Sequence, residues 1–134
     1  FVFAALILPK TLEGMKRIAQ HLGGKNFQAV PGMVDYRFAL ATQPERRASF
    51  DRINQWIIAN RGLHYEESDI AAVKTRTFVV NGKDDPIVIL PQAIRFLELL
   101  DNSTGYILPH CGHWAMLEYP QIFSDQTIAF LEGY

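Results

Sequence analysis

Two short segments of the sequence carry the residue types of a hydrolytic site. One apolar run ends in Gly82-Lys83-Asp84-Asp85-Pro86, and another ends in Cys111-Gly112-His113-Trp114. A carboxylate that accepts the Nδ1 proton of a histidine fixes the tautomer in which Nε2 can act as a general base. Pro86 favours an extended or turn conformation at Asp85, because proline disfavours the helical region for the residue before it. The two segments therefore predict the acid and the base of a catalytic triad.

The nucleophile of such a triad has no candidate in the sequence. None of the four serines is flanked as Gly-x-Ser-x-Gly; they are Ser49, Ser68, Ser103 and Ser124. We interpret Cys111 as a small packed side chain, since only the nearby His113 could lower its pKa. We therefore expect the nucleophile on an N-terminal half of the protein that these 134 residues do not contain.

Helical periodicity runs from Thr11 to about Ile70. Apolar residues recur at intervals of three and four in three stripes, and Gly23-Gly24 and Asn60-Arg61-Gly62 are stop signals. The stripes are Leu12, Met15, Ile18 and Leu22, then Val34, Phe38 and Ala41, and then Phe50, Ile53, Trp56 and Ile57.

Strands and helices alternate from Lys74 onward. The pattern predicts strands at 77–80 and 106–108 and helices at 92–100 and 120–132. The first strand is a β-branched and aromatic run without polar alternation, which is typical of a parallel strand buried on both faces. In open α/β sheets the functional groups lie at the carboxyl ends of the strands, where both candidate segments are found.

Two parallel strands do not make a complete sheet, because parallel sheets occur almost only as covered interiors. Further strands are expected, and Phe78, Val79, Val80 and Ile107 should be buried against protein outside this chain. We predict three regions: residues 1–10 as a possible core strand or entry to a cap, residues 11–73 as a helical cap, and residues 74–134 as the C-terminal part of an α/β core.

The composition indicates a chain with a packed core and argues against a nucleic-acid-binding or membrane-anchored protein. Apolar residues make up 49% of the chain, enough for a packed core, and 13 Lys and Arg balance 14 Asp and Glu. That balance argues against a nucleic-acid partner or a polybasic membrane anchor. The opening apolar run is too short to span a membrane. The single cysteine gives neither an internal disulfide nor a zinc site, so we expect a cytoplasmic protein without metal or cofactor.

Each candidate residue also has a structural interpretation. A Gly-Lys-Asp-Asp run is more often a solvated turn, and a lone histidine is about as often a buried structural residue. His21, His64 and His110 are interpreted as surface or structural residues. Spacing alone does not separate Asp84 from Asp85. The combination of two strand-end segments, with the acid before the histidine, favours a catalytic role.

The segment from Thr77 to Tyr134 resembles the C-terminal third of the α/β-hydrolase superfamily, and most of all its meta-cleavage product hydrolases. The resemblance is carried by Val-Val-Asn-Gly-Lys-Asp-Asp and by Cys-Gly-His-Trp-Ala-Met-Leu-Glu-Tyr-Pro. Those enzymes hydrolyse a carbon–carbon bond in vinylogous 1,5-diketones. Asp85 precedes His113 by 28 residues. This separation suits that family, and the resemblance therefore selects Asp85 as the triad acid. Residues 11–15 and 33–37 resemble the family's cap.

The resemblance implies a partial α/β-hydrolase fold in an enzyme that cleaves a 2-hydroxy-6-oxo-hexa-2,4-dienoate-type substrate. Asp85 would orient His113, which would act as base and then acid. Trp114 and the Ile87-Val88 loop would wall the pocket, and Arg37 would hold the anionic end of the dienoate.

The expected partners are that substrate, a companion segment or chain carrying the serine, and possibly further copies in a homo-oligomer. The alternatives are a carboxylesterase or other acyl hydrolase of the same fold, and a non-catalytic binding or interaction subunit on the same scaffold.

Overall fold

The computed structural model describes residues 9–25, 27–63 and 65–133, so the possible strand within residues 1–10 lies mostly outside the described residues. The chain forms two compact units. The first contains the described residues up to Ala19 and those from Ala29 to Tyr65. The second contains the described residues of the segment Gln20–Gln28 and those from Glu66 onward.

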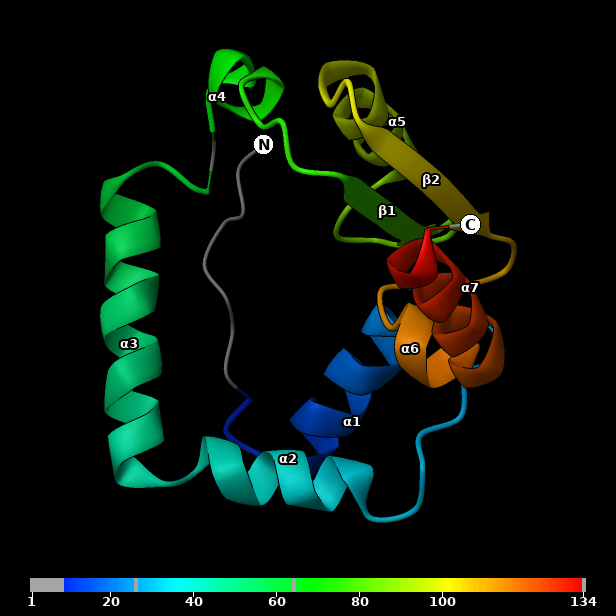
Figure 1. The fold of residues 1–134 in the computed structure, drawn as a ribbon. Coiled ribbons are helices and arrows are strands. Elements are labelled where there is room, and N and C mark those ends of the chain that lie inside the picture. The colour runs from blue at the N-terminus through cyan, green and yellow to red at the C-terminus, as the bar shows by residue number, and fades with distance from the viewer. Residues whose placement is uncertain (1–8, 26, 64, 134) are drawn as a thin grey trace. The chain divides into compact units, whose positions relative to one another are not determined.

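The first unit is helical, as the periodicity predicts. It holds most of α1 (Leu12–Leu22), together with α2 (Met33–Ala41) and α3 (Pro44–Ala59) (Figure 1). Helix α2 follows Gly32, whose φ of 79° suits a glycine. Helix α3 begins with Pro44, because proline lacks only a backbone N–H that a first helical turn leaves unpaired.

The third apolar stripe is only partly covered. Ile57 is buried, whereas Ile53 and Trp56 are 56% and 57% exposed. A helix advances 100° per residue, so Trp56 points away from the face that Ile57 shares with Phe50. The four apolar residues of this stripe therefore lie on a face of α3 that is wider than the part covered by the rest of this unit, and two of them remain exposed.

The second unit contains the predicted parallel strands. Strand β1 (Thr77–Gly82) pairs with β2 (Ser103–Leu108) in register from Thr77 beside Ser103 to Gly82 beside Leu108. Helix α5 (Leu90–Leu99) is the crossover between them. Both strands extend beyond the predicted apolar cores, because their polar and glycine ends pair in the ladder although they carry no hydrophobic signal.

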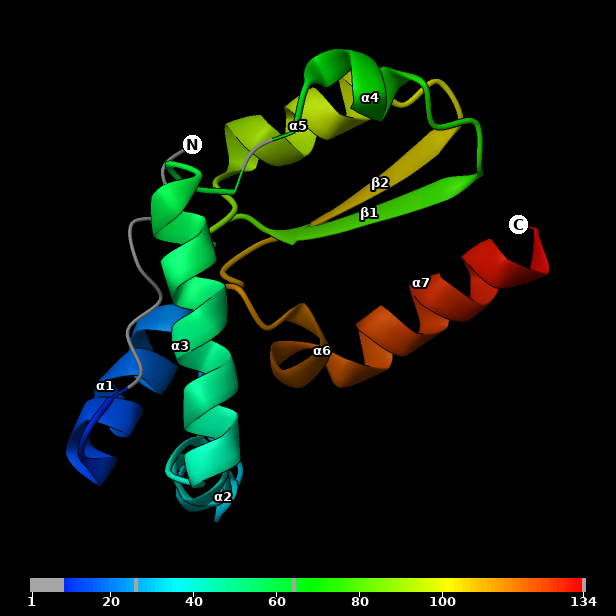
Figure 2. The ribbon, with the colours of Figure 1, turned by 90° about the vertical axis from the view of Figure 1, so that its left-hand side faces the viewer.

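Helices cover both faces of this two-stranded sheet. Helix α5 lies on one face and α7 (Pro120–Glu132) lies across the other (Figure 2). On the α7 side, the ring of Phe130 stacks on Phe78 with 5.1 Å between centroids. On the α5 side, the side chain of Leu97 lies against Gly105, where a Cβ atom would meet it at 2.5 Å.

Two short helices were not predicted as separate elements, although the first lies at the end of the region 11–70 where the helical pattern was found. They are α4 (Glu67–Ala71) and α6 (Ala115–Glu118). Segments of four or five residues contain about one helical turn, so they show no apolar period that a sequence pattern can reveal. Helix α6 follows directly after the segment that carries His113.

The core of the second unit lies at the carboxyl end of the strands. Leu108, Cys111 and Ala115 are buried there, and partly buried side chains pack around them: Val80, Tyr106, Tyr119 and Phe123. The strand residues Phe78, Val79, Val80 and Ile107 are half-buried. Their complete burial against protein outside this chain therefore stays a prediction.

Candidate active site

The two candidate segments follow the carboxyl ends of neighbouring parallel strands. The segment with Asp85 comes after β1, and the segment with His113 comes after β2. Backbone hydrogen bonds join them beyond the ladder: the Lys83 N–H donates to the carbonyl of Leu108, and the Asp84 N–H donates to that of Cys111. The parallel register therefore brings both segments to the same edge of the sheet.

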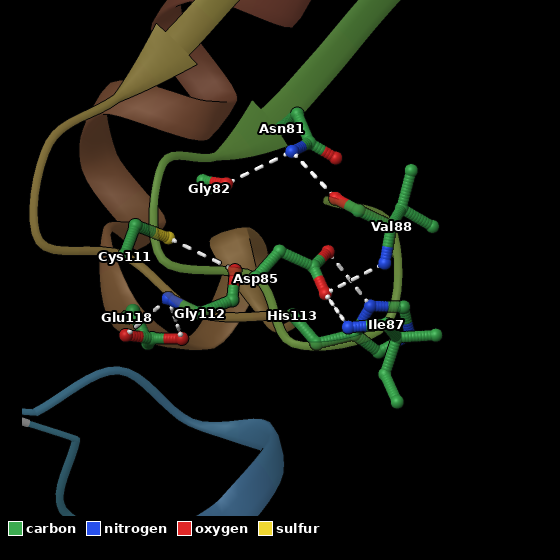
Figure 3. A network of polar contacts seen from close by, with 9 residues as sticks. All are labelled: Asn81, Gly82, Asp85, Ile87, Val88, Cys111, Gly112, His113 and Glu118. Carbon is green, nitrogen blue, oxygen red and sulfur yellow. Dashed lines mark hydrogen bonds and ion pairs between the residues drawn. The ribbon is translucent and has the colours of Figure 1, made fainter. Parts of the chain in front are cut away.

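Asp85 lies beside His113. Its carboxylate Oδ2 is 2.9 Å from the imidazole Nδ1 (Figure 3). The side chain of Asp85 is 4% exposed, and that of His113 is 34% exposed. Since an ionised carboxylate can only accept, this contact selects, for a neutral imidazole, the tautomer with its proton on Nδ1 and a lone pair on Nε2.

The remaining carboxylate oxygen of Asp85 is held by the loop that follows it. Oδ1 accepts the backbone N–H of Ile87 at 2.7 Å and that of Val88 at 3.0 Å. Asn81 supports the same loop from β1, because its Nδ2 donates to the carbonyl of Val88 at 3.0 Å. Asp84 is exposed and takes no part in this network. The geometry thus separates the two aspartates that spacing alone could not.

Asn81 and Glu118 are two residues to which the sequence analysis gave no role. Asn81 is 6% exposed and fixes the loop after Asp85. Glu118, at the end of α6, accepts the backbone N–H of Gly112. Both residues lie within the two segments that carry the family resemblance, but only contacts across the fold reveal what they hold.

Gly112 is required by close packing rather than by its backbone conformation. A glycine beside a histidine removes a side chain next to the imidazole and permits a tight turn, but the turn does not need glycine here, because Gly112 is not among the residues with positive φ. That conformation occurs instead at His110, with φ of 54°. At Gly112 an added Cβ would meet the Gly23 carbonyl carbon and the Leu22 carbonyl oxygen at 2.5 Å. Close backbone approach therefore excludes a side chain there.

Trp114 and the Ile87-Val88 loop lie next to the Asp85–His113 pair in the chain. Trp114 is buried, and its ring meets that of Phe27 edge to face with 5.2 Å between centroids. Ile87 and Val88 are half-buried, and their backbone N–H groups are directed at Asp85. The predicted role of these three side chains as pocket walls stays a prediction.

Arg37 belongs to the first unit, where it lies on α2. It lines a cavity of about 270 Å³ together with Met15, Leu40, Ala41, Arg46 and Phe50. Two guanidinium groups thus border a mainly apolar hollow. That combination suits an organic anion, because the apolar wall takes the carbon skeleton and an arginine pairs with the carboxylate.

The comparisons with known proteins agree with this geometry. A crystal structure of a serine hydrolase involved in carbazole degradation superposes with a TM-score of 0.90 and 40% sequence identity, covering 96% of this chain and 51% of that one. The chain has the fold of the C-terminal half of an α/β-hydrolase. No protein-family model matches it.

Several proteins that this chain is similar to are named as hydrolases of meta-cleavage products. The 2-hydroxy-6-oxo-6-(2'-aminophenyl)hexa-2,4-dienoic acid hydrolase of Metapseudomonas resinovorans is 41% identical over 121 residues, which are 90% of this chain and 42% of that protein. The meta-cleavage product hydrolase CumD, at 22% identity and a TM-score of 0.80, shares the fold over 95% of this chain and 48% of its own. The chain thus spans about half the length of the relatives it matches.

Ser103, the serine nearest in sequence to His113, does not lie where the triad of this hydrolase fold would need it. It begins β2, whereas His113 follows the far end of that strand. Six residues of strand extend about 20 Å. The Ser103 hydroxyl donates to the carbonyl of Leu100 at 2.7 Å and so closes the turn after α5. Its role is structural.

Cys111 is a neutral thiol rather than a nucleophile. It is fully buried, and burial raises its pKa to about 12, with further contributions from the negative charges of Glu118, Asp85 and Asp84. A thiolate is the reactive form of cysteine, and a thiol with so high a pKa does not form one near neutral pH. The interpretation of Cys111 as a packed side chain agrees with this environment.

Within residues 9–25, 27–63 and 65–133, no group of three or more His, Cys, Asp or Glu side chains could hold a metal ion. In the same described residues, no helix is long and apolar enough to cross a lipid bilayer.

Proposed function

We propose that the protein is a serine-type hydrolase that cleaves a carbon–carbon bond in a 2-hydroxy-6-oxo-hexa-2,4-dienoate-type compound. The observation that carries the proposal is the contact between Asp85 and His113 at the ends of two neighbouring strands. It is supported by the 41% identity to a hydrolase whose name states that substrate class. On this proposal, residues 11–73 form the cap and residues 74–134 form the C-terminal part of the catalytic core.

The chemistry of the pair follows from its hydrogen bonds. Asp85 holds the proton on Nδ1 of His113, so that Nε2 can take a proton from a serine or from water as either attacks the ketone carbon. As the carbon–carbon bond breaks and its electron pair goes to the leaving carbon, the protonated imidazole can return this proton to that carbon. Asp85 stabilises the imidazolium between the two steps without being protonated itself. The pair therefore supplies both base and acid catalysis.

The nucleophile must come from a segment outside these 134 residues, since none of the four serines here has an elbow sequence. Labelling the complete protein with a fluorophosphonate and mapping the adduct by mass spectrometry tests this point. The adduct should be found on a serine of the companion segment. An adduct on Ser49, Ser68, Ser103 or Ser124 would contradict the proposal, and a protein that does not react would favour the non-catalytic alternative.

The substrate class is proposed from Arg37. A guanidinium can pair with the carboxylate of a dienoate, and a charge-assisted hydrogen bond of this kind contributes roughly 1.5–3 kcal/mol. Arg37→Ala in the complete protein should therefore reduce kcat/KM for an anionic dienoate by about tenfold or more. A neutral aryl ester has no carboxylate, so its kcat/KM should change little.

The matched control is Arg52→Ala, which removes the same charge from the exposed surface of α3. It should leave both substrates unaffected. If Arg37→Ala slowed dienoate and ester cleavage in the same proportion, the esterase alternative would replace the carbon–carbon hydrolase.

A further inference from the structure

Glu118 binds the backbone of Gly112, directly before His113, and the backbone of Gly24 in the segment after α1. Its Oε1 accepts the N–H of Gly112 at 2.9 Å, and its Oε2 accepts the N–H of Gly24 at 2.9 Å and that of Gly112 at 3.1 Å. Figure 3 shows the carboxylate below Gly112, on the side away from Asn81. The proposed triad chemistry gives this carboxylate no role. All three of its hydrogen bonds nevertheless come from Gly112, next to His113, or from Gly24 in the segment packed against it.

The end of α1 and the segment after it pack against the backbone of Gly112 and His113. The His113 N–H donates to the carbonyl of Leu22 at 2.7 Å. At Gly24 an added Cβ would meet Glu118 Oε2 at 2.6 Å, the His110 carbonyl oxygen at 2.8 Å and the Gly112 nitrogen at 2.9 Å. Leu22, Gly24 and Glu118 thus form a clamp around the backbone of Gly112 and His113, which we call the histidine clamp.

We propose that Glu118 is a positioning residue that holds the His113 imidazole in line with Asp85 through this histidine clamp. The proposal rests on the proposed function, in which His113 is the catalytic base. Hydrogen bonds from backbone N–H groups to a carboxylate are stronger than those between neutral groups. Because a displacement of about 1 Å in a catalytic group can reduce the rate by about 10²-fold, the position of this segment controls turnover.

The clamp uses both carboxylate oxygens in three hydrogen bonds. In a glutamine at position 118 an NH₂ donor would face Gly112 N–H if it took the place of Oε1, or both Gly24 N–H and Gly112 N–H if it took the place of Oε2, so that at least one of the three bonds would be lost. An aspartate would keep both oxygens on a shorter side chain. Glu118→Asp should therefore retain more of the wild-type kcat than Glu118→Gln, which a role in packing alone would not explain, since glutamine matches the shape of glutamate better.

The main experiment compares Glu118→Gln with the wild type in the complete protein. We expect kcat for the dienoate to fall by about tenfold or more, with KM changed by less than about threefold, because the clamp acts on the base and not on the substrate. Amide hydrogen exchange at Gly24, Gly112 and His113 should accelerate, and the Nδ1 proton resonance of His113 should shift or broaden. Glu132→Gln, the same change at the exposed end of α7, is the matched control and should alter none of these.

A second variant approaches the clamp from its other side. Gly24→Ala should displace the segment after α1 from Glu118 and reproduce the effects on kcat and on the His113 resonance. Since both variants break one contact network, the double variant should lose little more activity than either single variant. Fully multiplicative losses would show that the two residues act separately and would overturn the proposal.

Two other results would also overturn it. One is wild-type kcat and wild-type amide protection in Glu118→Gln. The other is loss of protection throughout β1 and β2, or failure to fold, in Glu118→Gln and Gly24→Ala, since Glu118 would then support the whole unit rather than His113. The exchange and resonance measurements need no substrate. If the wild type failed to cleave the dienoate, the proposed function would fail while the clamp remained open to test by these two measurements.

Discussion

Replacing Asp85 with asparagine should lower kcat of the complete enzyme by about 10⁴-fold while leaving the fold intact. The reason is that the two carboxylate oxygens of Asp85 have different hydrogen-bond partners. Oδ1 accepts two backbone N–H groups, from Ile87 and Val88, so the asparagine oxygen must take that place. Its NH₂ group then faces Nδ1 of His113 and forces the imidazole proton onto Nε2. In that tautomer the histidine cannot accept the proton of a nucleophile.

Asp84→Asn is the matched control for this prediction. The Asp84 side chain is exposed, and the residue is tied to the fold by its backbone N–H, which the substitution keeps. Its kcat should stay within about twofold of the wild type, since exposed substitutions of this kind change little. Circular dichroism and thermal unfolding check that both variants fold. Equal and mild losses of kcat in the two variants would show that Asp85 does not orient His113.

Replacing Gly112 with alanine should have the largest effect on stability. The new Cβ would collide with backbone atoms of Leu22, Gly23 and Gly24, which cannot rotate out of the way as a side chain can. Overpacking of this kind costs about 3 kcal/mol when a rigid segment must move. We expect the midpoint of thermal unfolding to fall by about 5 °C or more and kcat to fall with it, because the displaced segment carries His113.

Gly14→Ala provides the comparison for Gly112→Ala. At Gly14 the nearest contact of an added Cβ is the Cβ of Pro9 at 3.0 Å, and alanine is favoured over glycine by about 1 kcal/mol inside a helix such as α1. The unfolding midpoint should therefore change little. A Gly112→Ala variant as stable as Gly14→Ala would contradict the close packing between the end of α1 and the histidine segment.

The elements of the fold could be predicted where a long pattern specifies them. Helices α1, α3, α5 and α7 follow apolar periods or proline signals, and the β-branched run of β1 marks a buried parallel strand. Helices α4 and α6 contain about one turn each and show no such period. The exposure of Ile53 and Trp56 could not be predicted either, because a stripe shows which residues are apolar and not how much of it the neighbouring segments cover.

The sequence by itself determined which candidate groups this protein carries: a carboxylate and a histidine, each directly after a strand, in an order that the proposed function completes with a nucleophile upstream. These are local facts, since a strand and the residue that follows it are adjacent in the chain. Tertiary structure decided what holds that chemistry in place. The amides of Ile87 and Val88 fix one oxygen of Asp85, and Glu118 joins Gly24 to Gly112. Such contacts depend on where the backbone turns in space and on which groups it brings within 3 Å of each other across long stretches of chain. No period or spacing in the sequence records those distances.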